Sequence, residues 1–131
     1  MRASDLRIGN IIGDGHGNPL RVTAVNDVLV VSNDYGFEYH ELHPFPLTHE
    51  ILEKCGFISE PIDEGYPEVG VYYSLPLNNE LYCNLCIISG DKNDLFEVCL
   101  FPYEQWFRFK YLHQLQNLFY ALCGEEIIVN L

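Results

Sequence analysis

Basic residues are scarce in this sequence. Seven lysines and arginines stand against 19 aspartates and glutamates among 131 residues, which gives a formal net charge of −12 at pH 7. Proteins bind the phosphate backbone of DNA or RNA through clustered Lys and Arg side chains that release counterions. The composition therefore argues against a nucleic acid as the direct partner. Because the acidic residues are spread from Asp5 to Glu126, a solvated acidic surface is favoured over a mimic of nucleic acid.

Long apolar runs are also missing. No stretch of 18 apolar residues occurs, and the first six residues hold no apolar core of a secretion signal. We therefore expect a cytoplasmic protein without a membrane span. The five cysteines are odd in number and lie scattered through apolar segments, which indicates reduced, buried thiols and not a disulfide framework.

Sequence signatures of catalysis are absent as well. No serine lies in a nucleophile-elbow context, and no pair of carboxylates stands out among the many acidic side chains. The glycine-rich stretch 13–17 lacks the Lys, Ser or Thr and the helix that would follow a phosphate cradle, so we interpret it as a turn. We therefore expect no enzyme, and we predict no catalytic residue and no cofactor.

The strongest pattern that the sequence does contain predicts an amphipathic helix over residues 111–123. At 100° per residue, four apolar side chains fall within one narrow arc: Tyr111, Leu115, Leu118 and Leu122. Gly124 is suited to end the helix, because glycine takes a positive φ without a Cβ clash. Burial of its six or seven apolar side chains at ~1.5–3 kcal/mol each contributes on the order of 10 kcal/mol before entropy is counted. We therefore expect this helix to cover the main core.

Residues 1–46 are predicted to form a small β lobe. Short apolar stretches at about ten-residue spacing each end in a turn signal, such as Asn33-Asp34-Tyr35-Gly36. This spacing is typical of a β meander or a small SH3-like barrel. Pro44 and Pro46 exclude a helix and indicate a boundary at this point of the chain.

Residues 47–131 are predicted to form an α+β lobe. Thr48 is expected to cap a short helix over residues 49–55 that ends at Gly56, and the polar stretch 59–67 is expected to be a surface loop. Alternating patterns predict three strands and a closing one, at 69–75, 81–87, 96–100 and 127–129.

The predicted fold class is therefore α+β. An N-terminal β meander or small SH3-like barrel is followed by an antiparallel sheet, and the single amphipathic C-terminal helix covers that sheet. The two lobes, 1–46 and 47–131, are expected to share one core.

Two pairs of metal-binding residue types stand out. Cys83 and Cys86 form a C-x-x-C, and His40 and His43 form an H-x-x-H, so the four together match the ligands of a tetrahedral zinc site. The two cysteines are expected within one strand, where residues three apart point to opposite faces. We therefore favour structural thiols, and a zinc or small-molecule site at these four residues is the alternative.

Basic and aromatic residues alternate at positions 106–111. Aromatic residues and arginine are enriched where proteins bind each other, whereas single-stranded nucleic acid would be gripped by stacking and by more cations than the two found here. A structural interpretation is an extended segment that buries Phe107 and Phe109. The predicted partner surface here comprises Trp106, Phe107, Arg108 and Lys110.

The polar side of the predicted helix is the second candidate surface. It carries His113, Gln116, Asn117 and Tyr120, whose side chains donate and accept hydrogen bonds. These residues extend the predicted partner surface, and a helix face in contact with water is the structural alternative.

In three segments the chain resembles a family of small proteins encoded in bacterial and phage genomes. The segments are Leu6-Arg7-Ile8-Gly9-Asn10, the stretch from Pro46 to Phe57, and the stretch from Tyr111 to Glu126 with its His-Gln-Leu-Gln-Asn sequence. The family has no established activity, cofactor or catalytic residues. The resemblance therefore implies a phage or mobile-element origin and carries no chemistry over to this chain.

These observations favour a non-catalytic, cytoplasmic protein-interaction or accessory module whose partner is a protein. An acidic mimic of nucleic acid that occupies a host DNA-binding protein is one alternative, and the zinc or small-molecule site is the other. The sequence does not predict the oligomeric state.

Overall fold

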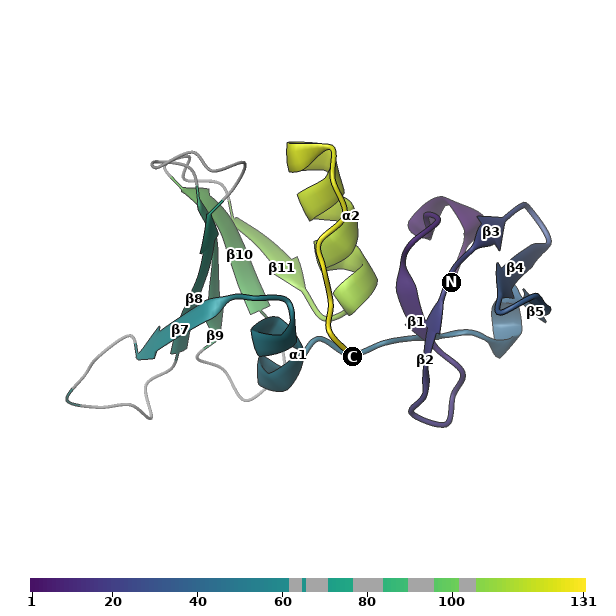
Figure 1. The fold of residues 1–131 in the computed structure, drawn as a ribbon, viewed down its shortest axis with the longest axis horizontal. Helices are drawn as coiled ribbons and strands as arrows, with labels where there is room; N and C mark the ends of the chain where they lie inside the picture. Colours follow the sequence, from purple (N-terminus) through teal and green to yellow (C-terminus); the bar gives the residue numbers. More distant parts are fainter. Residues whose placement is uncertain (62–64, 66–70, 77–83, 90–95, 102–105) are drawn as a thin grey trace. The chain divides into compact units, whose positions relative to one another are not determined.

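The computed structural model describes residues 1–61, 65, 71–76, 84–89, 96–101 and 106–131. By their contacts, the residues of the chain form two units (Figure 1). Unit 1 contains Met1–Pro46 and Tyr111–Glu126, and unit 2 contains Leu47–Lys110 and Ile127–Leu131. The first crossing between the units thus lies directly after Pro46, next to the prolines that indicate a boundary in the sequence.

Unit 1 combines two small antiparallel sheets with a helix. One sheet has the order β2-β1-β6, formed by Ile11–Gly13 (β1), Pro19–Arg21 (β2) and His43–Pro44 (β6). The other is a meander of Ala24–Val25 (β3), Leu29–Ser32 (β4) and Tyr35–Glu38 (β5), and short 3-10 helices lie at Ala3–Asp5 (η1) and Tyr39–Glu41 (η2). Residues 1–46 are all described, and their sheets do not close into a barrel. The predicted SH3-like barrel is therefore wrong, and the predicted meander is found for β3, β4 and β5.

The turn between β4 and β5 shows why this stretch folds locally. Asn33 and Asp34 have φ values of 51° and 62°, as both central residues of a type I′ turn require, and Asn and Asp tolerate this conformation. The turn sets the register that places Val30 opposite Phe37. Val30 belongs to the core of unit 1, together with Leu6, Ile12, Val22 and Leu42.

Helix α2 (Leu112–Cys123) is the C-terminal helix of unit 1. It ends as predicted, since Gly124 has a φ of 72° and its N–H donates to the Tyr120 carbonyl. Its buried side is centred on Leu112, Leu115 and Gln116, each 0% exposed, whereas Leu122 is 36% exposed. The buried face is therefore rotated about the helix axis relative to the apolar arc of Tyr111, Leu115, Leu118 and Leu122 that the sequence predicts. The contacts also group the helix with the N-terminal strands, whereas the sequence places it with residues 47–131.

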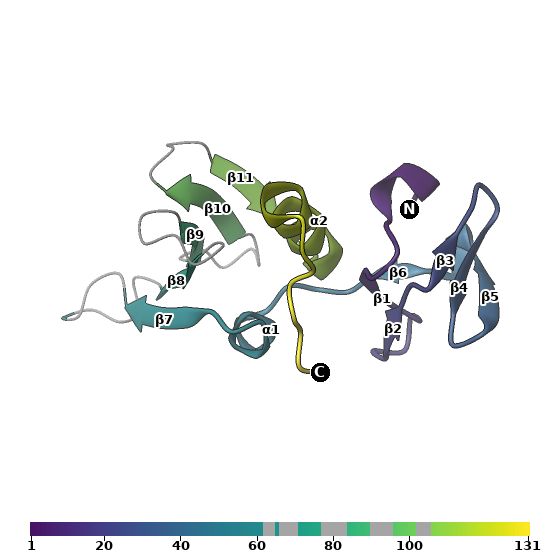
Figure 2. The ribbon, with the colours of Figure 1, turned by 45° about the horizontal axis from the view of Figure 1, so that its top comes forward.

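Unit 2 is built on a five-stranded antiparallel sheet of order β11-β10-β9-β8-β7 (Figures 1 and 2). The strands are Ile58–Pro61 (β7), Val71–Pro76 (β8), Asn84–Ser89 (β9), Phe96–Phe101 (β10) and Trp106–Phe109 (β11). The three central strands confirm the predicted meander; residues 69–70 and 81–83 of that prediction lie outside the described residues. The predicted surface loop at 59–67 is wrong for residues 59–61, which pair with β8, and residues 62–64 and 66–67 lie outside the described residues.

Helix α1 (His49–Lys54) packs on this sheet through its first turn and its buried side. The Ile51 N–H donates to the Thr48 hydroxyl oxygen at 3.1 Å, which confirms the predicted cap. The His49 Nδ1 atom lies 2.6 Å from the Tyr73 hydroxyl oxygen of β8, and the His49 ring contacts Phe96 of β10 at 5.6 Å between centroids. The side chains of Ile51 and Leu52 form the buried face of the helix.

The predicted closing strand at 127–129 is not found. Ile127 and Val129 are 4% and 8% exposed, while Ile128 between them is 75% exposed, so the side chains alternate as in a strand. Within the part of the chain that the structure describes, however, no strand pairs with this segment, and the Asn130 N–H donates to the Lys54 carbonyl at 3.0 Å. Burial of alternate side chains explains the sequence pattern without strand pairing.

The fold is thus mixed α+β, with small antiparallel sheets and one C-terminal amphipathic helix. Neither α1 nor α2 has the length and hydropathy of a membrane-spanning helix, and this holds for all the residues that the structure describes.

Candidate functional site

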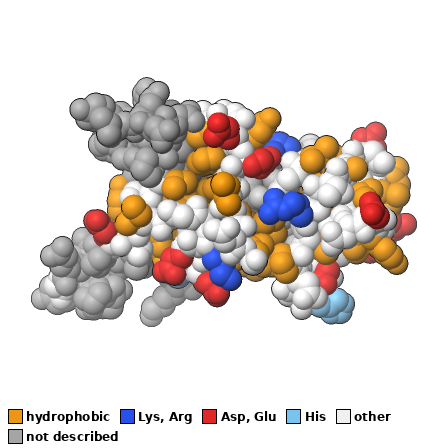
Figure 3. Space-filling view, in the orientation of Figure 1, with side chains coloured by type: hydrophobic (Ala, Val, Ile, Leu, Met, Phe, Trp, Pro, Cys, Tyr) orange, Lys and Arg blue, Asp and Glu red, His pale blue; other side chains and the backbone are white. Residues whose placement is uncertain are grey.

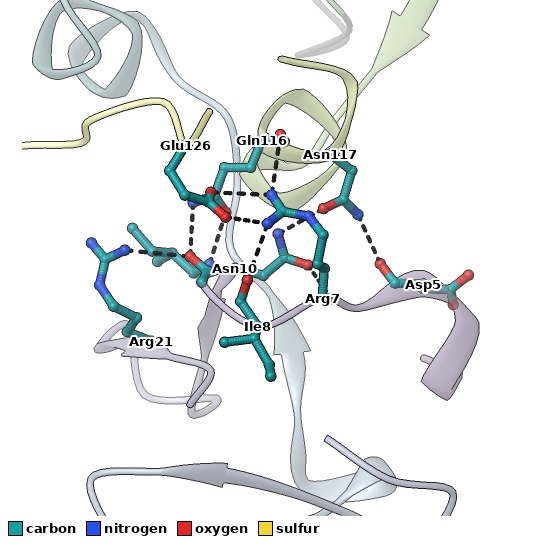
Figure 4. A network of polar contacts seen from close by, with 10 residues as sticks. Asp5, Arg7, Ile8, Asn10, Arg21, Gln116, Asn117 and Glu126 are labelled. Carbon is teal, nitrogen blue, oxygen red and sulfur yellow. Dashed lines mark hydrogen bonds and ion pairs between the residues drawn. The ribbon is translucent and has the colours of Figure 1, made fainter. Parts of the chain in front are cut away.

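The amide side chain of Gln116 joins α2 to the segment that leads into β1 (Figure 4). The Ile11 N–H donates to Gln116 Oε1 at 2.8 Å, and Gln116 Nε2 donates to the Gly9 carbonyl at 3.2 Å. Gln116 is 0% exposed. A carboxamide carries the same donor and acceptor as a peptide group, so this side chain gives the backbone at residues 9–11 the bonds that a neighbouring strand would give.

Asn117 makes a second set of bonds to the same segment (Figure 4). Its Oδ1 accepts from Asn10 Nδ2 at 2.8 Å, and its Nδ2 donates to the Asp5 carbonyl at 3.2 Å. The Asn10 side chain in turn accepts from the Arg7 N–H at 2.7 Å. Residues 5–10 are thereby held against the helix by neutral hydrogen bonds.

Arg7 connects the same network to the end of α2. Its guanidinium forms a two-armed ion pair with Glu126, in which Nη2 donates to Oε2 at 3.1 Å and Nη1 contacts Oε1. The guanidinium carbon also lies 4.1 Å from the centroid of the Tyr120 ring. Paired geometry and ring stacking are the contacts that arginine, and not lysine, supplies.

These contacts correct the second predicted partner surface. Gln116 is fully buried and His113 is 6% exposed. The side-chain amide of Asn117 is hydrogen-bonded to the Asn10 side chain and to the Asp5 carbonyl. Gln116 is therefore inaccessible to a protein partner, and His113 is almost so, whereas the predicted polar face requires both to be exposed. Tyr120 remains 42% exposed beside Arg7.

Sequence reasoning missed Arg7, Asn10 and Glu126 as members of this network. The signal that could have found them is the resemblance, because its first and third segments contain all of these residues and meet at this network. The two segments are thus explained by one set of internal contacts, and structure is a sufficient reason for their composition.

The first predicted partner surface lies on and directly after β11, which is an edge strand of the unit 2 sheet. Phe107 is 42% exposed, and its ring stacks on that of Phe109 with centroids 6.4 Å apart and an angle of 18°. Arg108 and Lys110 are exposed. The structural interpretation, which buries Phe107, is wrong for this residue because 42% of it is exposed. The side chain of Trp106 lies outside the described residues.

Phe107 completes a row of apolar cross-strand neighbours. The pairing places Tyr73 opposite Ile87, Ile87 opposite Val98, and Val98 opposite Phe107, so the four side chains share one face of the sheet. The first three are 2%, 0% and 0% exposed. The apolar face of the sheet therefore continues to β11 and becomes accessible there.

The four predicted zinc ligands are distributed over both units. His40 lies in η2 with its Nδ1 atom 3.2 Å from Glu38 Oε2, and His43 lies in β6. Cys86 lies in β9, and Cys83 lies outside the described residues. Within the described ranges, no three His, Cys, Asp or Glu side chains gather as metal ligands. In the same ranges Cys55 and Cys99 are buried, and burial raises the pKa of the Cys55 thiol to about 12.

Carboxylates are scattered over the face drawn in Figure 3. They lie singly or in small groups among apolar and neutral side chains. A mixed surface of this kind keeps a protein in solution.

No family model, curated protein or solved structure matches this chain. The assignment of a function therefore depends on the geometry of the two units.

Proposed function

We propose that this chain is a non-catalytic interaction module that binds a partner protein at β11. The surface used is the β11 patch, defined as Phe107, Arg108, Phe109 and Lys110. In keeping with the sequence analysis, we place the module in the cytoplasm and ascribe it to a phage or mobile element. The observation that carries the proposal is the 42% exposure of Phe107 at the end of an otherwise buried apolar row.

The apolar part of the patch sets the first requirement on the partner. A phenyl side chain has on the order of 200 Å² of surface, so about 80 Å² of Phe107 remains in contact with water. At roughly 25 cal/mol per Å², covering that area is worth about 2 kcal/mol, or about thirtyfold in affinity. The partner therefore needs an apolar side chain that reaches the stacked rings of Phe107 and Phe109.

The charged part of the patch sets the second requirement. Arg108 and Lys110 are two of only seven basic residues in a chain of net charge −12. Arg108 Nε lies 3.7 Å from Glu97 Oε1, and the two side chains are 73% and 49% exposed. An ion pair this exposed is worth little, so Arg108 is able to exchange Glu97 for a carboxylate of the partner. We therefore expect an apolar segment that is flanked by acidic residues.

Site-specific crosslinking in the producing cell tests the proposal. A photoreactive phenylalanine analogue replaces Phe107, and in a matched control it replaces Tyr35, which is 68% exposed on β5 in unit 1. We expect a discrete crosslinked protein from position 107 that position 35 does not give. Phe107→Asp is then expected to prevent binding of the purified partner, whereas Tyr35→Asp leaves it unchanged.

Stability measurements separate binding from folding in this test. Phe107→Asp should unfold at a urea midpoint near that of Tyr35→Asp, because both positions are exposed. Equal crosslinking from both positions, or loss of binding only in variants that have lost their fold, would contradict the proposal.

A further inference from the structure

Unit 1 contains an open pocket of about 350 Å³ at the N-terminal end of α2. This volume lies at the small end of the range of ligand pockets, roughly 300–1,000 Å³. Its wall combines the first turn of the helix with η1 and the end of β6. The lining residues are Met1, Ser4, Asp5, Pro44, Tyr111, His113, Gln114 and Asn117.

The helix end gives the pocket a positive pole. The Leu112 N–H donates to the Phe45 carbonyl at 2.9 Å, and the Gln114 N–H reaches the Tyr111 carbonyl at 3.2 Å. Among the described residues, the His113 N–H between them has no backbone acceptor outside the helix. The first turn also contains no acidic residue. Unpaired N–H groups at a helix N-terminus attract carboxylate and phosphate groups.

The His113 side chain is the second observation that points to a ligand. The residue is 6% exposed, and its Nδ1 atom is enclosed without a hydrogen-bond partner. Burial lowers its pKa, and the nearby Asp5 carboxylate opposes this shift only in part, so the imidazole is neutral at pH 7. A buried acceptor without a partner is tolerated better than a buried N–H. The proton therefore belongs on Nε2, as a donor for an occupant of the pocket.

Asp5 gives the pocket a negative pole. Its Oδ2 accepts from the Arg2 N–H at 2.9 Å, and its Oδ1 lies 3.6 Å from Arg2 Nη2. The Arg2 side chain is 82% exposed, so that ion pair is weak. These contacts lower the pKa of Asp5 and keep it ionised. A carboxylate has about four acceptor positions, which leaves room for an ammonium group.

We infer that this pocket binds a small zwitterion, a free α-amino acid. Its carboxylate would lie at the first turn of α2 near His113, and its ammonium would lie at Asp5. A simple anion would meet the Asp5 charge, and a simple amine would leave the helix end unused. No hydrogen bond joins Ser4 to His113, so the geometry assigns binding and not an activated nucleophile.

Amide NMR of the full chain with free amino acids tests this inference. We expect at least one amino acid at millimolar concentration to shift the His113 and Gln114 amide signals. Its N-acetyl derivative lacks the ammonium and its amide derivative lacks the carboxylate, and each should bind at least about tenfold more weakly. No shift with any amino acid, or equal affinity for either derivative, would overturn the inference.

A pair of matched variants adds an independent arm. Asp5→Asn keeps the acceptor for the Arg2 N–H but removes the charge, and it should weaken binding at least about tenfold. Asp14→Asn removes a carboxylate from the β1–β2 turn, away from the lining residues, and should leave binding unchanged. Equal weakening by both would show an effect of net charge alone and overturn the inference. The crosslinking test at β11 is unaffected by either result, because the pocket lies wholly within unit 1.

Discussion

Replacement of Gln116 by alanine is expected to destabilise unit 1 strongly. The side chain is fully buried and bonds two backbone groups of the segment that leads into β1. Truncation leaves the Ile11 N–H without its partner, where Ile11 itself is 1% exposed, and a buried unsatisfied donor costs about 1–3 kcal/mol. The Gly9 carbonyl loses its donor as well. The loss of one buried methylene group adds about 0.8 kcal/mol, and the better helix propensity of alanine returns only a few tenths.

The expected net loss is therefore about 3 kcal/mol in the free energy of unfolding. For a chain of this length it corresponds to roughly 10 °C in the melting temperature. Urea unfolding followed by circular dichroism measures the free energy, and hydrogen exchange measures the site. The Ile11 amide should lose protection in Gln116→Ala more than the amides of β8 and β9 in unit 2.

Two further variants make the reasoning refutable. Gln114→Ala removes a half-buried acceptor for the Tyr111 N–H, and the loss of such a helix cap should cost about 1 kcal/mol. Gln116→Glu keeps the acceptor for Ile11 but presents a carboxylate to the Gly9 carbonyl, which raises the pKa of the new carboxyl. Its stability should recover as the pH falls, because protonation restores a donor. A loss below about 0.5 kcal/mol in Gln116→Ala would refute the argument.

Three other predictions follow from single residues. Gly9→Ala should lower the free energy of unfolding by about 1 kcal/mol more than Gly17→Ala. Both glycines have φ near +90°, but a Cβ at Gly9 would lie 2.9 Å from a Glu126 carboxylate oxygen, whereas a Cβ at Gly17 would have nothing within 4 Å. Urea unfolding midpoints of the two variants measure the difference. Burial lowers the pKa of His113 below its usual 6.5, so the unfolded chain binds more protons just below that pH, and the stability of wild type should rise with pH through this window more than that of His113→Gln. Cys55, with its pKa raised to about 12, should resist iodoacetamide at pH 8 until urea unfolds the chain, whereas half-buried Cys123 should be labelled before Cys55. Peptide mass spectrometry measures the labelling of both, and early labelling of Cys55 would contradict its burial.

The parts of the fold that the sequence predicts well are those set by local chemistry. Thr48 caps α1 through its hydroxyl oxygen, Gly124 ends α2 with a positive φ, and Asn33 and Asp34 form a turn with positive φ at both positions. In each case the residue itself favours the local structure that it adopts. The central strands of the sheet are also found, because alternate burial leaves a period of two in the sequence.

The parts that fail depend on partners that are distant in sequence. Residues 127–129 carry the pattern of a strand, yet only alternate burial is present there. Residues 59–61 are two polar residues and a proline, yet β8 supplies a pairing edge for them. Neither outcome is encoded within the segment itself.

The polar side of α2 is the most informative of these failures. Hydropathy assigns Gln116 and Asn117 to water, because it weighs a side chain by the cost of burying it alone. That cost vanishes when the amide meets unpaired backbone groups, and here the groups lie more than 100 residues away at Gly9, Ile11 and Asp5. Periodicity within α2 carries no information on these distant groups, so it cannot place Gln116 and Asn117 in the interior.

The same amides link the fold of unit 1 to the inferred ligand pocket. Asn117 lines the pocket and donates to the backbone carbonyl of Asp5, so one side chain fixes the distance between the helix and the Asp5 backbone. An apolar contact at this position would leave that distance adjustable, since dispersion has little directional preference, whereas a hydrogen bond specifies separation and angle. The hydrogen bonds between α2 and residues 5–11 therefore do more than hold the helix in place: they fix the backbone that carries the Asp5 carboxylate next to the first turn of α2, where the inferred zwitterion would bind.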